Sequence, residues 1–322
     1  MISACPCIHL SLSLQTHMEL RQLKYFVKTA ELLNFSEAAK SLFITQSTLS
    51  QQIKQLEAEL GAQLFQRNSH GVTITEIGAE LLPYAKSTLH SADSCVEHIR
   101  DVQNLMVGTL NIGVTYTFSP TLNETVLTFM KRYPEVKLNI YNKTMEELMG
   151  MLEKREVDFV LSFRPTQTYN RIESHILFDN HLVVVVNKNH ELARCSSIDL
   201  ASLQQYKLAL PGKGLQARNQ FDMIIGGKEY TYNCPIELNE VNILLKIVKE
   251  SSLATILSEA TIYSEPDLVA IRLDAPGTDM EGCVHVLKDS YRKCSALKFV
   301  KLLCESDSIR EKAFNWLKGS IS

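Results

Sequence analysis

Residues 34–75, NFSEAAKSLFITQSTLSQQIKQLEAELGAQLFQRNSHGVTIT, contain the pattern that decides the fold of the N-terminal part of the chain. Ser36 is a suitable N-cap for a short predicted helix with a small apolar face. A turn at residues 43–44 follows, and Thr45 then caps a second predicted helix that Gly61 ends. The residues after Gly61 are typical of a two-stranded wing. This order of elements predicts a winged helix-turn-helix.

The second predicted helix has an apolar face and a polar face. Its apolar residues recur at helical spacing and predict a buried stripe of Leu49, Ile53, Leu56 and Leu60. Its other face carries amides, hydroxyls and one lysine, namely Gln46, Ser47, Ser50, Gln51 and Lys54. In a DNA major groove a glutamine can bridge adenine N6 and N7, and a serine can pair with several base edges. The polar face therefore favours DNA reading, and the alternative is an amphipathic helix whose polar face only contacts solvent.

Phosphate contacts are expected at the rim of this face. Arg67 and His70 flank the predicted wing, and the helix N-termini at Ser36 and Thr45 offer backbone N–H groups to phosphate oxygens. Residues 18–75 have a net charge of only about +1, in a chain with a net charge of −3. Because nonspecific affinity comes mainly from phosphate neutralisation, we expect one copy to bind DNA weakly and two or more copies to act together.

The stretch MELRQLKYFVKTAELLNFSEAAKSLFITQSTLSQQIKQLEAELGAQLF, which starts at Met18, resembles the DNA-binding domain of the LysR-type transcriptional regulators. The patterns "ELRQL-YFV", "FSEAA" and "TQ-LS-QI-LE-LG-LF-R" occur in the family's order. The resemblance implies a cytoplasmic DNA-binding regulator without a cofactor. It implies that Gln46, Ser47, Ser50 and Gln51 lie in the major groove and that Arg67, Thr73 and Thr75 belong to the wing. Ser47 and Gln51 replace the proline and arginine of many members, so base preference cannot be transferred.

Residues 76–106 continue as one helical pattern. Its apolar positions alternate at spacings of three and four, at Leu82, Ala85, Leu89, Ala92, Val96 and Ile99. This spacing predicts a coiled-coil seam that joins two copies in a homodimer, and the alternative is packing against the helix's own domain. The resemblance adds a homotetramer and a pseudo-palindromic site on double-stranded DNA, and it leaves contact with RNA polymerase open.

After Gly108 strands and helices alternate, first as βαβαβ and then in a second set that begins near residue 181. Such alternation predicts a mostly parallel sheet with helices on both faces. The resemblance implies an effector-binding domain over residues 107–322 with two lobes, similar to periplasmic solute-binding proteins. The first lobe would comprise residues 107–178 and 283–322, the second residues 179–282, and an effector would bind in the cleft between them.

A turn rich in hydroxyl groups follows the first strand of this domain. It contains Thr115, Tyr116, Thr117 and Ser119, and Ser119-Pro120 is typical of a helix N-terminus. Hydroxyls and free N–H groups at a helix N-terminus predict a site for an anion, so we expect a small anionic effector. By family position the resemblance adds Ser162, Arg164, Lys213 and Ser258. Each of these residues alone also fits an ordinary turn.

Two other kinds of DNA-binding protein are alternatives to a regulator that responds to a small-molecule effector. Peroxide-sensing members of the family use thiols in this half of the chain, which makes Cys195 and Cys234 candidates for a thiol-based redox sensor. However, Gly214 and Leu215 occupy the place of the reactive cysteine in those members. An effector-independent DNA-binding protein is the other alternative. An enzyme is not expected, because the chain has no Gly-x-Ser-x-Gly, phosphate-binding glycine loop or His-Glu-x-x-His.

The remaining features predict no metal and no membrane span. Residues 1–17 precede the family pattern, have no basic segment typical of a signal peptide, and are expected to be a disordered extension. Within them Cys5, Cys7 and His9 do not form a tetrahedral ligand set. The longest aliphatic run, residues 182–186, is far shorter than the about 18 residues of a transmembrane helix and predicts a buried strand.

Overall fold

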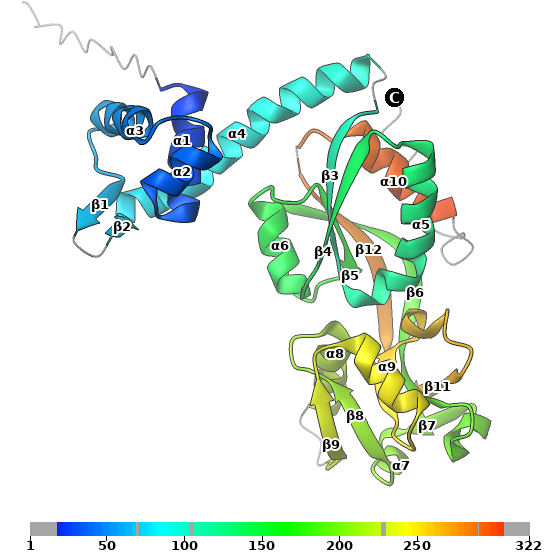
Figure 1. Cartoon of the computed structure of the whole chain (residues 1–322). Helices are drawn as coiled ribbons and strands as arrows, with labels where there is room; N and C mark the ends of the chain where they lie inside the picture. Colours follow the sequence, from blue (N-terminus) through cyan, green and yellow to red (C-terminus); the bar gives the residue numbers. More distant parts are fainter. Residues whose placement is uncertain (1–17, 69–70, 104–105, 227–229, 289, 306–322) are drawn as a thin grey trace, which may run out of the picture. The chain divides into compact units, whose positions relative to one another are not determined.

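The computed structural model describes residues 18–68, 71–103, 106–226, 230–288 and 290–305 (Figure 1). The chain divides into two compact units, one ending at Ser94 and the other starting at Cys95. The boundary falls inside the long helix α4 (Glu76–Val102). Among the described residues no helix combines the length and the apolar character that a membrane span requires.

The first unit consists of three helices, a two-stranded wing and the start of α4. The bounds are α1 Leu20–Leu32, α2 Phe35–Ser41, α3 Gln46–Leu60, β1 Phe65–Asn68 and β2 Gly71–Ile74. The wing strands β1 and β2 pair antiparallel. Phe26, Leu49 and Ile53 are fully buried in a core that all three helices and the wing share. The predicted winged helix-turn-helix is confirmed.

Helix α3 begins and ends where the sequence predicts. The Thr45 hydroxyl accepts a hydrogen bond from the Thr48 N–H at 3.2 Å, and Gly61 ends the helix in the left-handed conformation at φ 64°. The predicted buried stripe extends to Leu56 but not to Leu60, which is 37% exposed. Leu60 lies in the last turn, where the chain leaves the core.

The prediction of Ser36 as the N-cap of the preceding helix is wrong. Helix α2 starts at Phe35, and its N-cap is Asn34, whose side-chain oxygen accepts hydrogen bonds from the N–H groups of Ser36 and Glu37. Asn34 is the last residue in an extended conformation, so its side chain reaches these free N–H groups first. Ser36 is thereby the second residue of the helix and has its hydroxyl available for another partner.

The wing is tied closely to the start of α4. The Thr75 hydroxyl donates to the Gln63 carbonyl at 2.7 Å and accepts from the Gly78 N–H at 3.0 Å. Gly78 has no room for a side chain, because a Cβ there would lie 2.4 Å from the Leu64 carbonyl oxygen. This close approach fixes the wing relative to the helices of the first unit.

The predicted seam on α4 divides into two parts. Ala85 is 1% exposed in the core of the first unit, and Leu82 and Leu89 pack against the same core. By contrast, Val96 and Ile99 are 53% and 56% exposed. The N-terminal part of the seam thus packs on its own domain, which was the alternative reading, and only the C-terminal part leaves large apolar side chains exposed for a second copy.

The second unit has two lobes (Figure 1). The first lobe contains β3 (Gly108–Val114), η1 (Tyr116–Phe118), α5 (Ser119–Arg132), β4 (Val136–Asn142), α6 (Met145–Glu153), β5 (Phe159–Phe163) and α10 (Cys294–Glu305). The second lobe contains η2 (Glu191–Arg194), β7 (Ser197–Asp199), α7 (Leu200–Leu203), β8 (Lys207–Pro211), α8 (Gln216–Ile225), β9 (Asn233–Leu238), α9 (Val241–Lys249), β10 (Thr255–Ser258), η3 (Glu259–Ile262) and β11 (Leu268–Asp274). Two strands connect the lobes, β6 (Ile172–Asn187) and β12 (Asp279–Leu287).

The strand pairing is mixed. Strand β3 pairs parallel with β4 and β5, and β8 pairs parallel with β9, as predicted. The connecting strands differ, because β12 pairs antiparallel with β5 and β6, and β10 and β11 pair antiparallel with β6. A strand that returns from the other lobe enters the sheet in the opposite direction, which the alternation of elements does not reveal. Strands β7 and β11 were not predicted from the sequence.

Each lobe has its own core. In the first lobe α5 and α10 cover one face of the sheet and α6 covers the other (Figure 1). In the second lobe the predicted buried strand, residues 182–186, lies at the centre of a core that β8, β10, α8 and α9 complete. The confirmed α/β fold thus places the carboxyl end of β5 and the start of α8 beside the connecting strands.

Candidate functional site

The outward face of α3 is available for a partner. Gln46, Ser47, Gln51 and Lys54 are exposed and Ser50 is half-buried, whereas Leu49 and Ile53 on the opposite face are buried. The face therefore presents two amides and a cation on a helix whose other side is anchored in a core. This arrangement has the form of a recognition helix.

Side-chain contacts also fix the start of this helix. The Ser36 hydroxyl donates to the Gln46 side-chain oxygen at 3.0 Å, which joins the N-terminus of α2 to that of α3. The Thr45 hydroxyl lies 2.9 Å from the Ser47 hydroxyl. Ser36 thus contacts another predicted DNA-binding residue and orients its amide, a role that the sequence did not indicate.

The wing residues have different environments. Thr73 is exposed on β2, opposite Gln66. Thr75 uses its hydroxyl to close the wing onto α4, so its contacts are structural. The side chain of Arg67 and the whole of His70 lie outside the described residues.

The turn between α2 and α3 exposes an aromatic ring that the sequence analysis did not single out. Phe43 is 96% exposed and adopts the left-handed conformation at φ 56°. Its N–H donates to the Lys40 carbonyl at 3.1 Å, which closes the turn. A residue other than glycine or asparagine rarely adopts this conformation.

The predicted anion turn is buried. Thr115 and Thr117 are buried, and the hydroxyls of Tyr116 and Thr117 make no hydrogen bond of normal geometry among the described residues, although the Tyr116 hydroxyl lies near the Thr117 hydroxyl and the Ala217 backbone. Burial raises the pKa of Tyr116 to about 12, although the Thr117 hydroxyl and the Ala217 backbone oppose this rise. Ala217 belongs to α8, so the turn reaches the second lobe. These hydroxyls are candidates for a partner that enters from the cleft.

The helix start after this turn differs from the prediction. The N-cap of α5 is Phe118 and not Ser119, because the 3-10 turn η1 runs directly into the helix. The Phe118 N–H is already bonded to the Thr115 carbonyl at 3.1 Å. The side chain of Ser119 lies outside the described residues.

Two of the serines predicted by family position have partners within the protein. Ser162 is buried, and its hydroxyl donates to the Phe163 carbonyl at 3.1 Å and lies 2.9 Å from Nε2 of His285. Ser258 is buried and its hydroxyl lies 2.9 Å from that of Thr261. Both hydroxyls therefore hold the fold together, whereas Lys213 is exposed.

Arg164 lines a cavity of about 390 Å³ between the two lobes. The first lobe contributes the end of β5 and Met145, the second lobe contributes α8, and the start of β12 closes one side. The Arg164 guanidinium lies 2.9 Å from the Glu281 carboxylate, and both side chains are partly exposed. Apolar side chains make up much of the remaining wall, namely Met145, Phe163, Pro165, Met223 and Met280.

Gln216 is a functional candidate that the sequence analysis missed. It is buried at the start of α8, where its amide oxygen accepts from the Phe163 N–H at 3.2 Å and its amide nitrogen donates to Met145 Sδ at 2.9 Å. This side chain joins the two lobes at the wall of the cavity. Nothing in its local sequence distinguishes it from any other glutamine in the first turn of a helix.

The described cysteines and acidic residues give no metal site. Within the described ranges no group of three or more His, Cys, Asp or Glu side chains is placed to hold a metal ion. Cys195 and Cys234 are exposed free thiols. Cys283 is buried, and burial raises the pKa of its thiol to about 12, which keeps it protonated and unreactive.

Comparisons with known proteins assign both parts of the chain. Residues 20–79 match the family described as bacterial regulatory helix-turn-helix protein, lysR family, and residues 103–307 match the LysR substrate binding domain. The chain is 34% identical over 188 residues to the HTH-type transcriptional regulator BudR of Raoultella terrigena, which covers 58% of this chain and 65% of that protein. It is 28% identical over 280 residues to the transcriptional dual regulator GltC of Bacillus subtilis, and this match covers 86% of this chain and 92% of that protein. Among solved structures, full-length OxyR from Pseudomonas aeruginosa, with a cysteine-to-aspartate substitution, has a TM-score of 0.68 at 23% identity and covers 90% of this chain and 94% of that one.

Proposed function

The chain belongs to the LysR family of transcriptional regulators, and from this premise we propose that it controls transcription in the cytoplasm in response to a small molecule bound between the two lobes. Its relatives are regulators and not enzymes. The observation that carries the proposal is the cavity of about 390 Å³ whose wall both lobes form, in a chain that also presents a recognition helix.

For DNA binding we propose that Gln46 and Gln51 read bases and that Arg67 positions the protein on phosphates. Gln46→Ala should weaken binding to the best DNA site by about 1–3 kcal/mol and reduce the discrimination between bases at the position that it contacts. Arg67→Ala should weaken binding to all DNA sequences alike. Gln63→Ala is a matched control, because this exposed amide lies outside α3. Fluorescence anisotropy with specific and random duplexes measures both affinities. Equal losses on specific and random DNA for the Gln46 and Arg67 variants would exclude the groove assignment.

For the effector we propose a small molecule with a carboxylate and an apolar body. Arg164 is the cation in the cavity wall, and the methionines and Phe163 suit an apolar body. Because Nη1 of Arg164 is already paired with Glu281, an incoming carboxylate has to compete with that partner or use the other guanidinium N–H groups. Binding should stabilise the full chain by about 2.7 kcal/mol at a hundredfold excess over Kd, which a thermal-shift screen of carboxylates, amino acids and phosphates detects.

Three variants locate the site. Arg164→Met should abolish the thermal shift, while Arg171→Met, an exposed arginine outside the cavity wall, should not. Thr117→Val keeps the shape but removes an unpaired hydroxyl, so it tests whether the effector reaches the buried turn. An effector whose affinity depends on Thr117 but not on Arg164 would move the site from the cavity to the turn.

Two other outcomes correspond to the alternative functions. The protein is a redox sensor if no compound shifts the melting temperature and if peroxide changes DNA binding of the natural protein but not of a variant in which serine replaces Cys195 or Cys234. The exposure of both thiols is compatible with this alternative. If neither compounds nor peroxide change DNA binding, the protein acts without an effector.

We also propose that two copies bind a pseudo-palindromic site. The nearly neutral DNA-binding domain favours joint binding of two copies, and the exposed Val96 and Ile99 offer an apolar contact between their α4 helices. Sedimentation of the full chain measures the oligomeric state, and half-site mutation of the bound DNA measures whether both copies are needed.

A further inference from the structure

Helix α4 is held by a different unit at each end. Near its start Ala85 is buried in the core of the DNA-binding unit. Near its end Glu97 and Asp101 contact the first lobe of the effector-binding unit. The boundary between the two compact units, after Ser94, lies between these anchors and not in the loop that follows the helix.

Lys293 is the centre of the anchor at the end of α4. Its amine lies 3.0 Å from the Glu97 carboxylate and 3.0 Å from the Asp158 carboxylate, and it donates to the Thr109 carbonyl at 2.9 Å. The Lys293 side chain is only 11% exposed. Burial alone would lower the pKa of Lys293, but Asp158 and Glu97 outweigh it and the pKa is raised, so the amine stays charged. One buried cation thus connects α4, β3 and the residue just before β5.

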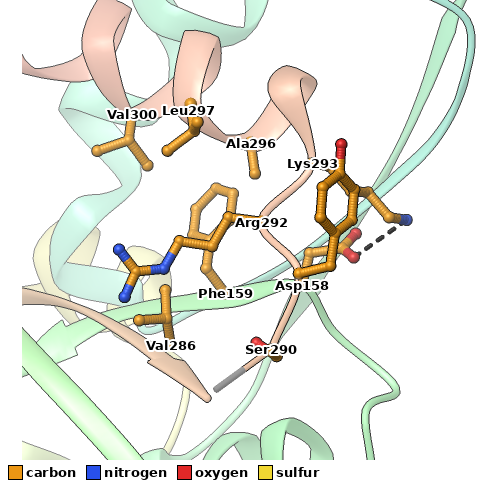
Figure 2. Close-up of a pocket in the computed structure, with 10 residues that line it drawn as sticks. Asp158, Phe159, Val286, Ser290, Arg292, Lys293, Ala296, Leu297 and Val300 are labelled. Carbon is orange, nitrogen blue, oxygen red and sulfur yellow. Dashed lines mark ion pairs between the residues drawn. The ribbon is translucent and has the colours of Figure 1, made fainter. Parts of the chain in front are cut away.

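The surroundings of Lys293 identify this cluster as a structural anchor. Figure 2 shows Lys293 beside Asp158, at the edge of a cavity lined by Phe159, Val286 and Val300. The cavity has a volume of about 20 Å³, which is room for about one water molecule and not for a ligand. The charged groups therefore pair with one another and do not bind a ligand.

Asp101 forms a second contact with the same region. Its carboxylate accepts hydrogen bonds from the Cys294 N–H, at 2.8 Å, and from the Tyr291 hydroxyl. The Tyr291 ring also packs edge-on against His98, with 4.8 Å between ring centroids. Positions 97, 98 and 101 lie on one face of a helix, so the last turns of α4 contact the first lobe along a continuous surface.

The middle of α4 carries two features that weaken a helix. Three hydroxyls in successive turns bond to the carbonyl four residues earlier, each at 2.9 Å: Thr88 to Tyr84, Ser91 to Ser87, and Ser94 to His90. Each hydroxyl competes for the carbonyl that its own backbone N–H uses, and such bonds slightly destabilise helices and often bend them. The segment 87–94, STLHSADS, is also rich in weak helix formers.

We propose that the joint between the DNA-binding and effector-binding units lies inside α4, at residues 87–94, and that Lys293 fixes the turns beyond it to the first lobe. A movement of the first lobe then carries residues 96–102 with it, and the change in direction occurs in the serine-rich segment. This inference rests on the contacts at the two ends of α4 and does not depend on which effector binds.

Hydrogen exchange of the full chain, followed by mass spectrometry, tests the proposal. Amides of residues 88–94 should exchange at least about tenfold faster than those of residues 96–102. Replacing Thr88, Ser91 and Ser94 together by alanine should slow exchange in 88–94 by about tenfold, because alanine is the better helix former and makes no bond to the carbonyl four residues earlier, and should leave 96–102 unchanged. Lys293→Met should speed exchange in residues 96–102 to the rate of 88–94.

Two further variants complete the design. Lys301→Met, an exposed lysine on α10, is the control for Lys293→Met and should change nothing in α4. If Lys293→Met does not fold, Glu97→Gln removes the charge on the α4 side alone. This variant should speed amide exchange in residues 96–102 while the amides of the first lobe stay protected. Uniform exchange along α4, or fastest exchange in 96–102 of the unmodified protein, overturns the proposal.

Discussion

Replacing His285 should change how the stability of the protein depends on pH. His285 is fully buried on β12, where Nε2 lies 2.9 Å from the Ser162 hydroxyl and Nδ1 lies 2.8 Å from the Ser174 hydroxyl. The Ser162 hydroxyl donates to Phe163, so it accepts from Nε2–H, and Nδ1 accepts from Ser174. This arrangement suits the neutral ring, and burial lowers the pKa of His285 from 6.5 to about 4.

The size of the effect follows from the two pKa values. Above pH 6.5 the ring is neutral in the folded and the unfolded chain. As the pH falls from 6.5 to about 4, the unfolded chain binds a proton that the folded chain cannot, so stability is lost. At about 1.4 kcal/mol per pH unit, the loss reaches about 3 kcal/mol near pH 4.

Urea unfolding of the full chain at pH 7.5 and 4.5, followed by circular dichroism, measures this loss. His285→Phe should be less stable than the natural protein at pH 7.5 by about 1–3 kcal/mol, because Ser174 loses its partner. The difference in unfolding free energy between the two proteins should shrink by about 2–3 kcal/mol at pH 4.5, since the variant has no imidazole at position 285 that can bind a proton in the unfolded chain. Carboxylates titrate in both proteins and cancel in the difference. Parallel stability curves for the two proteins would refute the reasoning.

Three further predictions concern the DNA-binding unit and α4. Val96→Glu should dissociate the dimer in sedimentation without lowering the melting temperature of the DNA-binding unit, whereas Leu89→Glu should destabilise that unit itself. A Val96→Glu variant that stays dimeric would show that Val96 does not contribute to the contact between two copies. Gly78→Ala should cost about 3 kcal/mol in thermal unfolding because of the approach to Leu64, and unchanged stability would contradict that contact. Phe43→Asn should stabilise the unit by about 1 kcal/mol, since asparagine accepts the left-handed conformation more readily; reduced DNA affinity would show instead that the exposed ring contacts DNA.

The local elements and the family can be recognised from the amino-acid sequence alone. The spacing of Leu49, Ile53 and Leu56 decides which face of α3 is buried, and Thr45 and Gly61 decide where the helix begins and ends. These are interactions within a few residues, so their pattern is visible in the chain. The same holds for the parallel strands of the first lobe and for the buried strand at residues 182–186, whose apolar side chains are consecutive.

Which polar groups have partners, by contrast, depends on the tertiary packing. Ser162 bonds to His285, 123 residues away, and the Gln216 amide bonds to Phe163, 53 residues away. Likewise, Lys293, which directly precedes α10, meets Glu97 only because the last turns of α4 contact the first lobe. Composition shows that such side chains exist, but whether a buried hydroxyl or amine is free for a ligand depends on what the fold brings within about 3 Å of it, since one hydrogen-bond partner is enough to change its role.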